Sequence, residues 1–216
     1  MSADSRKNKY PKPHLQFEQD LWACGICGVA GIDEAGRGAW AGPVFAAAVI
    51  LPADLTMRDH LSGVRDSKQM SPAQRSRWAE QIKIHALTWG VGQASSEEID
   101  TRGILPATRL AMQRAIQQLS PQPHHLLLDY VILPECDLPQ TALVKGDRQS
   151  LSIAAASVLA KTARDALMVK MDERYPRYGF AHHKGYGTAR HRLALQENGL
   201  CAIHRRSFRP MKDIMI

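Results

Sequence analysis

The sequence has little of what secreted and membrane proteins need. It contains four cysteines in 216 residues, and no apolar run approaches the length that crosses a bilayer. The first twenty residues are polar and lack the apolar core of a signal peptide. We therefore expect a cytoplasmic protein that makes no membrane contact and in which disulfides are not favoured.

The few cysteines leave one metal site open as an alternative. Cys24 and Cys27 have the spacing of zinc ligands, and Cys201 with His204 would supply a second pair. The gap between the two pairs is much longer than in compact zinc modules. We favour ordinary reduced cysteines.

The chain also lacks internal repeats, low-complexity tracts and any linker rich in Pro, Gly or Ser that would divide it. We therefore predict one main domain over residues 21–216, which includes a C-terminal helical extension from about residue 188. Residues 1–20 are polar and contain Pro11 and Pro13, a composition that predicts a flexible N-terminal tail.

Positive charge is in excess. Lys and Arg number 28 against 21 Asp and Glu, so the formal net charge is +7. A basic surface favours a polyanionic partner such as nucleic acid. A charge of this size also serves solubility, so charge alone does not decide between the two interpretations.

Hydrophobic patterns predict strands followed by alternating strands and helices. Strands are indicated by apolar runs at 28–33, 44–51, 87–93, 125–130 and 141–147. Helices are indicated over 72–87, 104–119, 150–173 and 188–198. Ser71 and Pro72 suit the start of the first helix, and Gly199 suits the end of the last. This order is typical of an α/β fold with a mixed central sheet flanked by helices.

Acidic residues end three of the predicted strands: Asp33 with Glu34, then Asp129, then Asp147. Each acid alone could simply cap a loop or a helix. As a set at the rim of a sheet they favour a metal site, because clustered carboxylates cannot all ionise without a cation. Oxygen ligands suit Mg²⁺ or Mn²⁺, and two such ions about 4 Å apart can clamp a phosphodiester.

Asp33 and Glu34 pose a geometric difficulty. Consecutive residues of a strand point to opposite faces, so both acids can share one site only if the strand bends or ends there. Gly36 and Gly38 permit such a bend, and their backbone N–H groups, with Arg37 between them, suit phosphate or sugar. An ordinary tight turn is the alternative for this short motif.

Several stretches together resemble the ribonuclease HII family, the type 2 ribonucleases H. The matching segments are GIDEAGRGAWAGPV (31–44), RDSKQMS (65–71), LLLD (126–129), VKGDRQSLSIAAASVLAKTARD (144–165), YGFAHHKGYGT (178–188) and HRRSF (204–208). They follow the family's order and spacing after about residue 28. Two positions depart from the family pattern: Ala39 stands where proline is usual, and Tyr130 stands where a small residue is common.

The resemblance implies a ribonuclease H-like fold and an endonuclease that cuts the RNA strand of RNA–DNA hybrids and single ribonucleotides embedded in duplex DNA. It implies products with 5′-phosphate and 3′-hydroxyl ends, and Mg²⁺ or Mn²⁺ as cofactor. The family's metal-binding and catalytic acids match Asp33, Glu34, Asp129 and Asp147. We expect the protein to act as a monomer.

The resemblance also implies substrate-binding residues. The family's ribonucleotide-sensing loop matches Gly36, Arg37 and Gly38, and its junction-sensing tyrosine matches Tyr186, for which packing in a half-buried site is the alternative. Lys184 lies beside Tyr186 and is a candidate phosphate contact.

Further support residues are expected on the long helix. Ser157, Lys161 and Asp165 share one face, where they would orient the metal ligands and nearby phosphate; a plain surface ion pair between Lys161 and Asp165 is the alternative.

Two rival functions stay open. A non-catalytic protein that binds RNA–DNA hybrids would have the same fold, but four acids facing phosphate have no use in a pure binder. A two-metal nuclease that acts on DNA junctions is a second rival.

The basic C-terminal region has two interpretations as well. It would either bind the duplex backbone through Arg205, Arg206 and Arg209 or form a charged tail.

Overall fold

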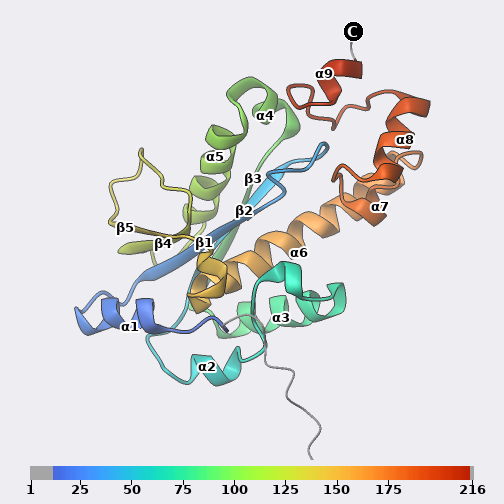
Figure 1. Cartoon of the computed structure of the whole chain (residues 1–216). Helices are drawn as coiled ribbons and strands as arrows, with labels where there is room; N and C mark the ends of the chain where they lie inside the picture. Colours follow the sequence, from blue (N-terminus) through green and yellow to red (C-terminus); the bar gives the residue numbers. More distant parts are fainter. Residues whose placement is uncertain (1–11, 215–216) are drawn as a thin grey trace, which may run out of the picture.

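The computed structural model describes residues 12–214 (Figure 1). A five-stranded sheet lies at its centre, in the order β3-β2-β1-β4-β5. The strands are β1 Val29–Ala35, β2 Val44–Ile50, β3 Thr88–Ala94, β4 His125–Asp129 and β5 Gln140–Leu143. β1 pairs antiparallel with β2, and β2 with β3, whereas β1, β4 and β5 run parallel. The sheet is therefore mixed, and the predicted α/β class is confirmed.

Helices cover both faces of this sheet. They are α1 Gln16–Ala23, α2 Met57–His60, α3 Pro72–His85, α4 Ser96–Arg102, α5 Ile104–Ile116, α6 Leu151–Arg174, α7 Phe180–His183, α8 Ala189–Asn198 and α9 Met211–Ile214, with 3-10 turns at Ser67–Gln69 and Gly146–Arg148. Ser71 begins α3 with a capping box, as the sequence predicts. No helix between residues 12 and 214 combines the length and the apolar character needed to cross a membrane.

The α5 face and the α6 face of the sheet have separate apolar cores. Ile32 and Leu128 pack with Met112 of α5, whereas Ala47 and Val49 pack with the first turns of α6. The first ten residues of α6, 151–160, are buried on every side. This burial requires close approach: a Cβ on Gly31 would lie 2.2 Å from the backbone of Ser152. Helix α6 is thus fixed directly against β1.

The N-terminal helix corrects one expectation. Residues 16–20 were expected to belong to a flexible tail, but they form most of α1, and Glu18 is 1% exposed. The Glu18 carboxylate accepts hydrogen bonds from the hydroxyl groups of Ser150 and Ser152 and from the Ser152 N–H, at 2.6, 2.6 and 3.0 Å. It thereby anchors α1 to the N-terminus of α6. Residues 1–11 of the predicted tail lie outside the described residues.

The C-terminal region packs on the far half of α6. Helices α7 and α8 form a third apolar cluster with Met168 of α6 and Ala41 of the β1–β2 loop. Beyond residue 160, the buried positions of α6 are Arg164 and Met168. In Figure 1 this region lies at the end of the molecule opposite α1.

Candidate active site

Three carboxylates meet at one edge of the sheet. In the parallel pair, Ile32 lies beside Leu128 and both pack toward α5, so the next residues, Asp33 and Asp129, turn toward α6. Asp147 lies in the 3-10 turn Gly146–Arg148, which follows β5. One ligand oxygen from each of these three acids lies within 4.8 Å of the others. The Asp129 carboxylate also accepts the Gly146 N–H at 2.8 Å, which ties β4 to the turn.

Burial and mutual repulsion disfavour charge on these acids. Burial raises the pKa of Asp33 well above its usual range, and the charges of Glu34 and Asp129 add to the effect. Burial also raises the pKa of Asp129, and it raises the pKa of Asp147 to about 6, with Asp66 and Asp129 contributing. A bound divalent cation would remove this penalty, and an all-oxygen donor set suits Mg²⁺ or Mn²⁺. The residues present therefore fit the metal.

Glu34 stands apart from the other three acids. β1 stays regular through Ala35, with Glu34 opposite Ala46 of β2, so the strand does not bend between the two acids. Glu34 nevertheless lies close enough for its charge to raise the pKa of Asp33. One carboxylate oxygen pairs with Arg37 at 3.1 Å, and the other is buried without a hydrogen-bond partner. Burial raises the pKa of Glu34 although Arg37 opposes the shift. Its assignment as a metal ligand stays a prediction.

A pocket of about 370 Å³ opens beside these acids. Its lining includes the predicted substrate-binding residues Gly36, Arg37, Gly38 and Tyr186, and Glu34. Gly36 has φ +94°, and a Cβ there would lie 2.0 Å from the Arg164 side chain, so the loop needs glycine at this position. The structure thus brings together two segments that are far apart in the sequence.

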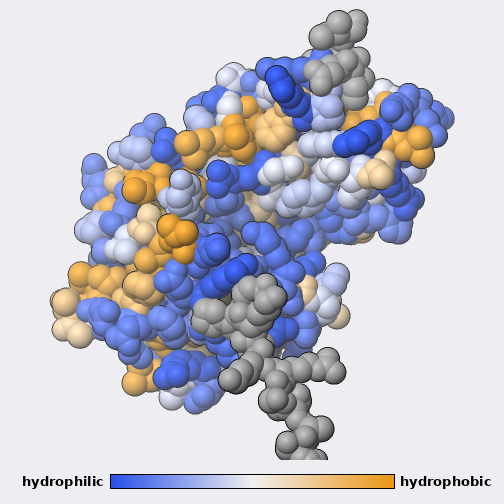
Figure 2. Space-filling view, in the orientation of Figure 1, coloured by the Kyte–Doolittle hydropathy of each residue, from blue (hydrophilic) through white to orange (hydrophobic). Residues whose placement is uncertain are grey.

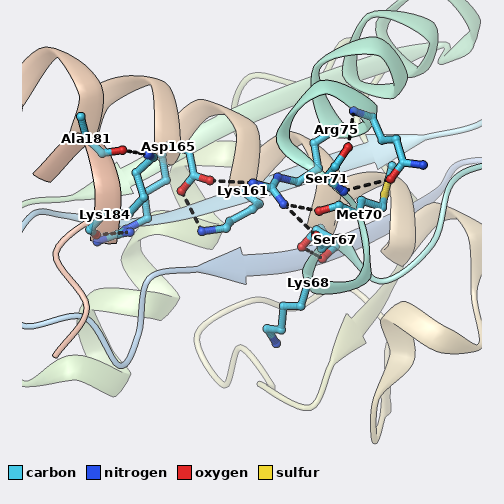
Figure 3. A network of polar contacts seen from close by, with 12 residues as sticks. Ser67, Lys68, Met70, Ser71, Arg75, Lys161, Asp165, Ala181 and Lys184 are labelled. Carbon is cyan, nitrogen blue, oxygen red and sulfur yellow. Dashed lines mark hydrogen bonds and ion pairs between the residues drawn. The ribbon is translucent and has the colours of Figure 1, made fainter. Parts of the chain in front are cut away.

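The three predicted support residues of α6 face this site. The Ser157 hydroxyl lies 3.0 Å from that of Ser67, and its hydrogen bond to Asp33 favours the charged carboxylate. Lys161 lines the pocket and pairs with Asp165 at 2.7 Å, and Asp165 also pairs with Arg75 of α3 at 3.1 Å (Figure 3). Lys161–Asp165 is therefore part of a network between α3 and α6 rather than an isolated surface pair.

Lys184 lies in a second hollow. Its ammonium group donates to the carbonyl oxygen of Ala181, and it lines a groove of about 520 Å³. Lys68, Lys161 and Tyr186 line both the groove and the pocket, which are therefore neighbours. Figure 2 shows hydrophilic side chains over much of the face between α3 and α7.

The structure adds Lys68 to the site, together with an ion pair that supports it. Burial alone would lower the pKa of Lys68, but the nearby charges of Asp33, Asp66 and Asp147 raise it. Asp66 is buried, accepts the Lys68 N–H at 2.9 Å and pairs with Arg148 at 3.0 Å. Arg148 follows Asp147 directly, so this ion pair joins the Lys68 loop to the turn that carries Asp147. The acid and the base two residues apart in RDSKQMS, Asp66 and Lys68, were the available signal.

Two alternatives from the sequence are wrong. Arg205 was a candidate duplex contact, but it is fully buried and bonds to backbone carbonyl groups. Cys24 and Cys27 follow α1, whereas Cys201 and His204 follow α8 at the opposite end of the molecule in Figure 1, so one zinc ion cannot bind both pairs.

Tyr130, which follows Asp129 where the family commonly has a small residue, has φ +65° and is 68% exposed.

A mixed sheet with clustered carboxylates at its rim, beside a basic pocket, defines a metal-dependent nuclease with a ribonuclease H-like fold. Comparison with known proteins agrees: the ribonuclease HII family model matches residues 30–211. The chain is 55% identical over 207 residues to ribonuclease HII of Synechococcus sp. (strain JA-3-3Ab), covering 96% of this chain and 93% of that protein. The chain belongs to the ribonuclease HII family.

Other relatives support this membership. Ribonuclease HII of Chloroflexus aurantiacus is 53% identical over 205 residues, covering 94% of this chain and 97% of the relative. The crystal structure of ribonuclease H2 from Pyrococcus horikoshii OT3 superposes with a TM-score of 0.73 at 26% identity, covering 86% of this chain and 96% of that one. The protein is thus a nuclease, a hydrolase of phosphodiester bonds.

Proposed function

We propose that this nuclease hydrolyses the RNA strand of RNA–DNA hybrids and cuts at single ribonucleotides embedded in duplex DNA, leaving 5′-phosphate and 3′-hydroxyl ends. One observation carries the proposal: the grouped carboxylates of Asp33, Asp129 and Asp147 adjoin the pocket that Gly36–Gly38 and Tyr186 line. Family membership supports the same substrate.

The acids supply the catalytic centre. Mg²⁺ or Mn²⁺ held by Asp33, Asp129 and Asp147, with Glu34 as a further ligand, would activate water and stabilise the leaving oxygen. Ser157 holds the Asp33 carboxylate, and the Asp66–Arg148 pair holds the turn that carries Asp147. Lys68 and Lys161 place positive charge beside the site for the phosphate.

The glycine loop suits the 2′-hydroxyl that distinguishes RNA from DNA. The carbonyl oxygens of Gly36 and Arg37 already accept bonds from the Ala39 N–H and from Arg205, at 3.2 and 2.8 Å. Within residues 12–214, the N–H groups of Arg37 and Gly38 have no hydrogen-bond partner. These N–H groups are the available donors for the ribose, with the Tyr186 ring against the sugar or base.

A labelled duplex with one ribonucleotide tests the function. We expect cleavage 5′ to the ribonucleotide with Mg²⁺ or Mn²⁺, none with chelator, and no cleavage of an all-DNA duplex. Tyr186→Ala should lower kcat/KM on this duplex by about tenfold to a hundredfold, the range of one lost stacking contact, and lower it less on a long hybrid. Tyr186→Phe, which keeps the ring, should lose less.

Two results would contradict the proposal. Binding without cleavage under every metal condition would favour a non-catalytic hybrid-binding protein. Equal cleavage of the all-DNA duplex would favour a nuclease that does not recognise ribose.

A further inference from the structure

Residues 201–208, here called the clamp segment, contact the Gly36–Gly38 loop and, through His191, Tyr186, but do not themselves line the pocket. We propose that the clamp segment positions the Gly36–Gly38 loop and Tyr186 relative to each other, and thereby sets the preference for a single ribonucleotide. The inference rests on the proposed reading roles of that loop and of Tyr186. His204 and Arg205 are its positioning residues, and neither lines the pocket.

Arg205 holds the glycine loop. Its side chain is fully buried and donates to the carbonyl oxygen of Arg37 at 2.8 Å and to that of Gly42 at 2.9 Å. The Gly42 N–H in turn donates to the carbonyl oxygen of Ile203 at 2.8 Å. The clamp segment therefore contacts both ends of residues 37–42 and bonds directly to Arg37, the central residue of the predicted reading loop.

His204 holds Tyr186 through a second histidine, and the carbonyl acceptor fixes the protons along the chain. Nδ1 of His191 lies 3.0 Å from the carbonyl oxygen of Tyr186, so Nδ1 carries the proton and donates it. Nε2 of His191 is then the acceptor for Nε2–H of His204 at 3.1 Å. Nδ1 of His204 accepts the Cys201 N–H at 2.9 Å. Burial lowers the pKa of both histidines to about 4, in keeping with two neutral rings.

The two held elements are also joined directly. The N–H of Trp40, from the loop after Gly38, donates to the carbonyl oxygen of Gly185 at 2.8 Å. Arg164 of α6 donates to the carbonyl oxygens of Ala41 at 3.1 Å and Lys184 at 2.9 Å. Its guanidinium carbon lies 5.3 Å from the centre of the Tyr186 ring. Movement of the clamp segment would therefore change the geometry of the whole pocket wall.

The chemistry of this arrangement favours positioning over simple stabilisation. Within residues 12–214, Arg164 and Arg205 form no salt bridge, and one nitrogen of Arg205 is buried without a partner. Burial, with repulsion from Arg164, lowers the pKa of Arg205 to about 9. Apolar side chains often stabilise a core as well as such buried charges do. Directional hydrogen bonds add fixed geometry, and small displacements in a site reduce rates strongly.

The test compares kcat/KM on a duplex with one ribonucleotide and on a long hybrid, with the ratio of the two as the readout. Arg205→Lys, which loses the forked donor, and His204→Asn, which loses the donor at Nε2, should each lower this ratio about fivefold or more. His204→Gln, whose amide reaches the Nε2 position, should keep the ratio within about twofold. Exposed Arg177→Lys and His60→Gln are the matched controls and should change nothing.

A coupling measurement separates positioning from structure. In a Tyr186→Ala background, His204→Asn should lower the ratio no further, because its effect passes through Tyr186, whereas Arg205→Lys should still lower it. Equal losses on both substrates by Arg205→Lys and His204→Asn would overturn the inference. Arg205→Lys keeps most of the side-chain volume, so the test stands even if His204→Asn does not fold. If Tyr186→Ala alone leaves the ratio unchanged, the proposed role of Tyr186 fails separately, while cleavage of the duplex still tests the proposed function.

Discussion

Asp33, Asp129 and Asp147 place three carboxylates where burial and mutual repulsion disfavour their charge. Native proteins do not retain such a group for stability, because each ionised carboxylate would be better solvated in water. The arrangement is useful only with a cation between the oxygens. Without metal, a charged carboxylate at this site should therefore make the folded protein less stable than a neutral side chain does. A single substitution can measure this difference.

Asp147→Asn tests this loss of stability. The pKa of Asp147 is raised to about 6 in the folded state, above about 3.9 for an unfolded aspartate, so its contribution to stability is present below pH 4 and lost as pH rises through 6. In chelator at pH 7.5 we expect the variant to unfold at a Tm higher than wild type by roughly 5 °C. Thermal unfolding followed by circular dichroism measures the difference.

The same comparison at pH 4 is the internal check, because wild-type Asp147 is then largely protonated and the advantage of Asn should nearly vanish. Asp137→Asn, at an exposed position, should give no such pH-dependent gain. An equal difference in Tm at both pH values would show that charge on Asp147 is not the cause.

At this scale the sequence predicted much of the site. Apolar runs that lead into Asp33, Asp129 and Asp147 indicated a common rim, and strand alternation indicated that Glu34 would need a bend to join them. The bend is absent from β1, and Glu34 pairs with Arg37. Arg205 was misassigned because a basic segment shows nothing of which arginine is buried, and its carbonyl partners at Arg37 and Gly42 are distant in sequence.

At the scale of elements, α6 organises the site. Its first turns are buried on all sides, which places Ser157 beside Asp33. Its later turns carry Lys161 to the pocket and the buried Arg164 against Gly36. The position of α6 along β1 is therefore a condition for the site. Glu18 of α1 binds the N-terminal turn of this helix.

Glu18→Ala should destabilise the protein by about 2–4 kcal/mol, because buried Ser150 and Ser152 lose their common acceptor. Urea unfolding at equilibrium measures the change in the free energy of unfolding. Asp20→Ala, at an exposed position of the same helix, should change it by less than about 0.5 kcal/mol. Equal small effects of both variants would mean that α1 does not anchor α6.

The strands and the long helices were predictable because their patterns are local. β5 ends at Leu143 rather than at Asp147, since Lys145 has φ +58° and the chain turns before the acid. Helix α1 was missed for a different reason. Its apolar face is short, with Phe17, Leu21 and Trp22 packed against a small core cluster. The buried Glu18 is held by serines more than 130 residues away, a contact that no local pattern encodes.

At the scale of the whole molecule, two opposite charges have to coexist at one surface. The chain is basic, with net charge +7, and basic residues such as Lys68 and Lys161 surround the pocket. The carboxylates beside it would repel the phosphate that these cations attract. A divalent ion held by these acids would resolve the conflict, because it would attract phosphate in turn.

Direct titration with Mn²⁺ tests this claim without any enzyme assay. Free Mn²⁺ is counted by its electron paramagnetic resonance signal while the ion is added to wild type, to Asp33→Asn and to Asp20→Asn as the surface control. We expect wild type and Asp20→Asn to bind Mn²⁺ alike, and folded Asp33→Asn to bind it at least tenfold more weakly. Unchanged Mn²⁺ affinity in folded Asp33→Asn would contradict a metal centre at these carboxylates.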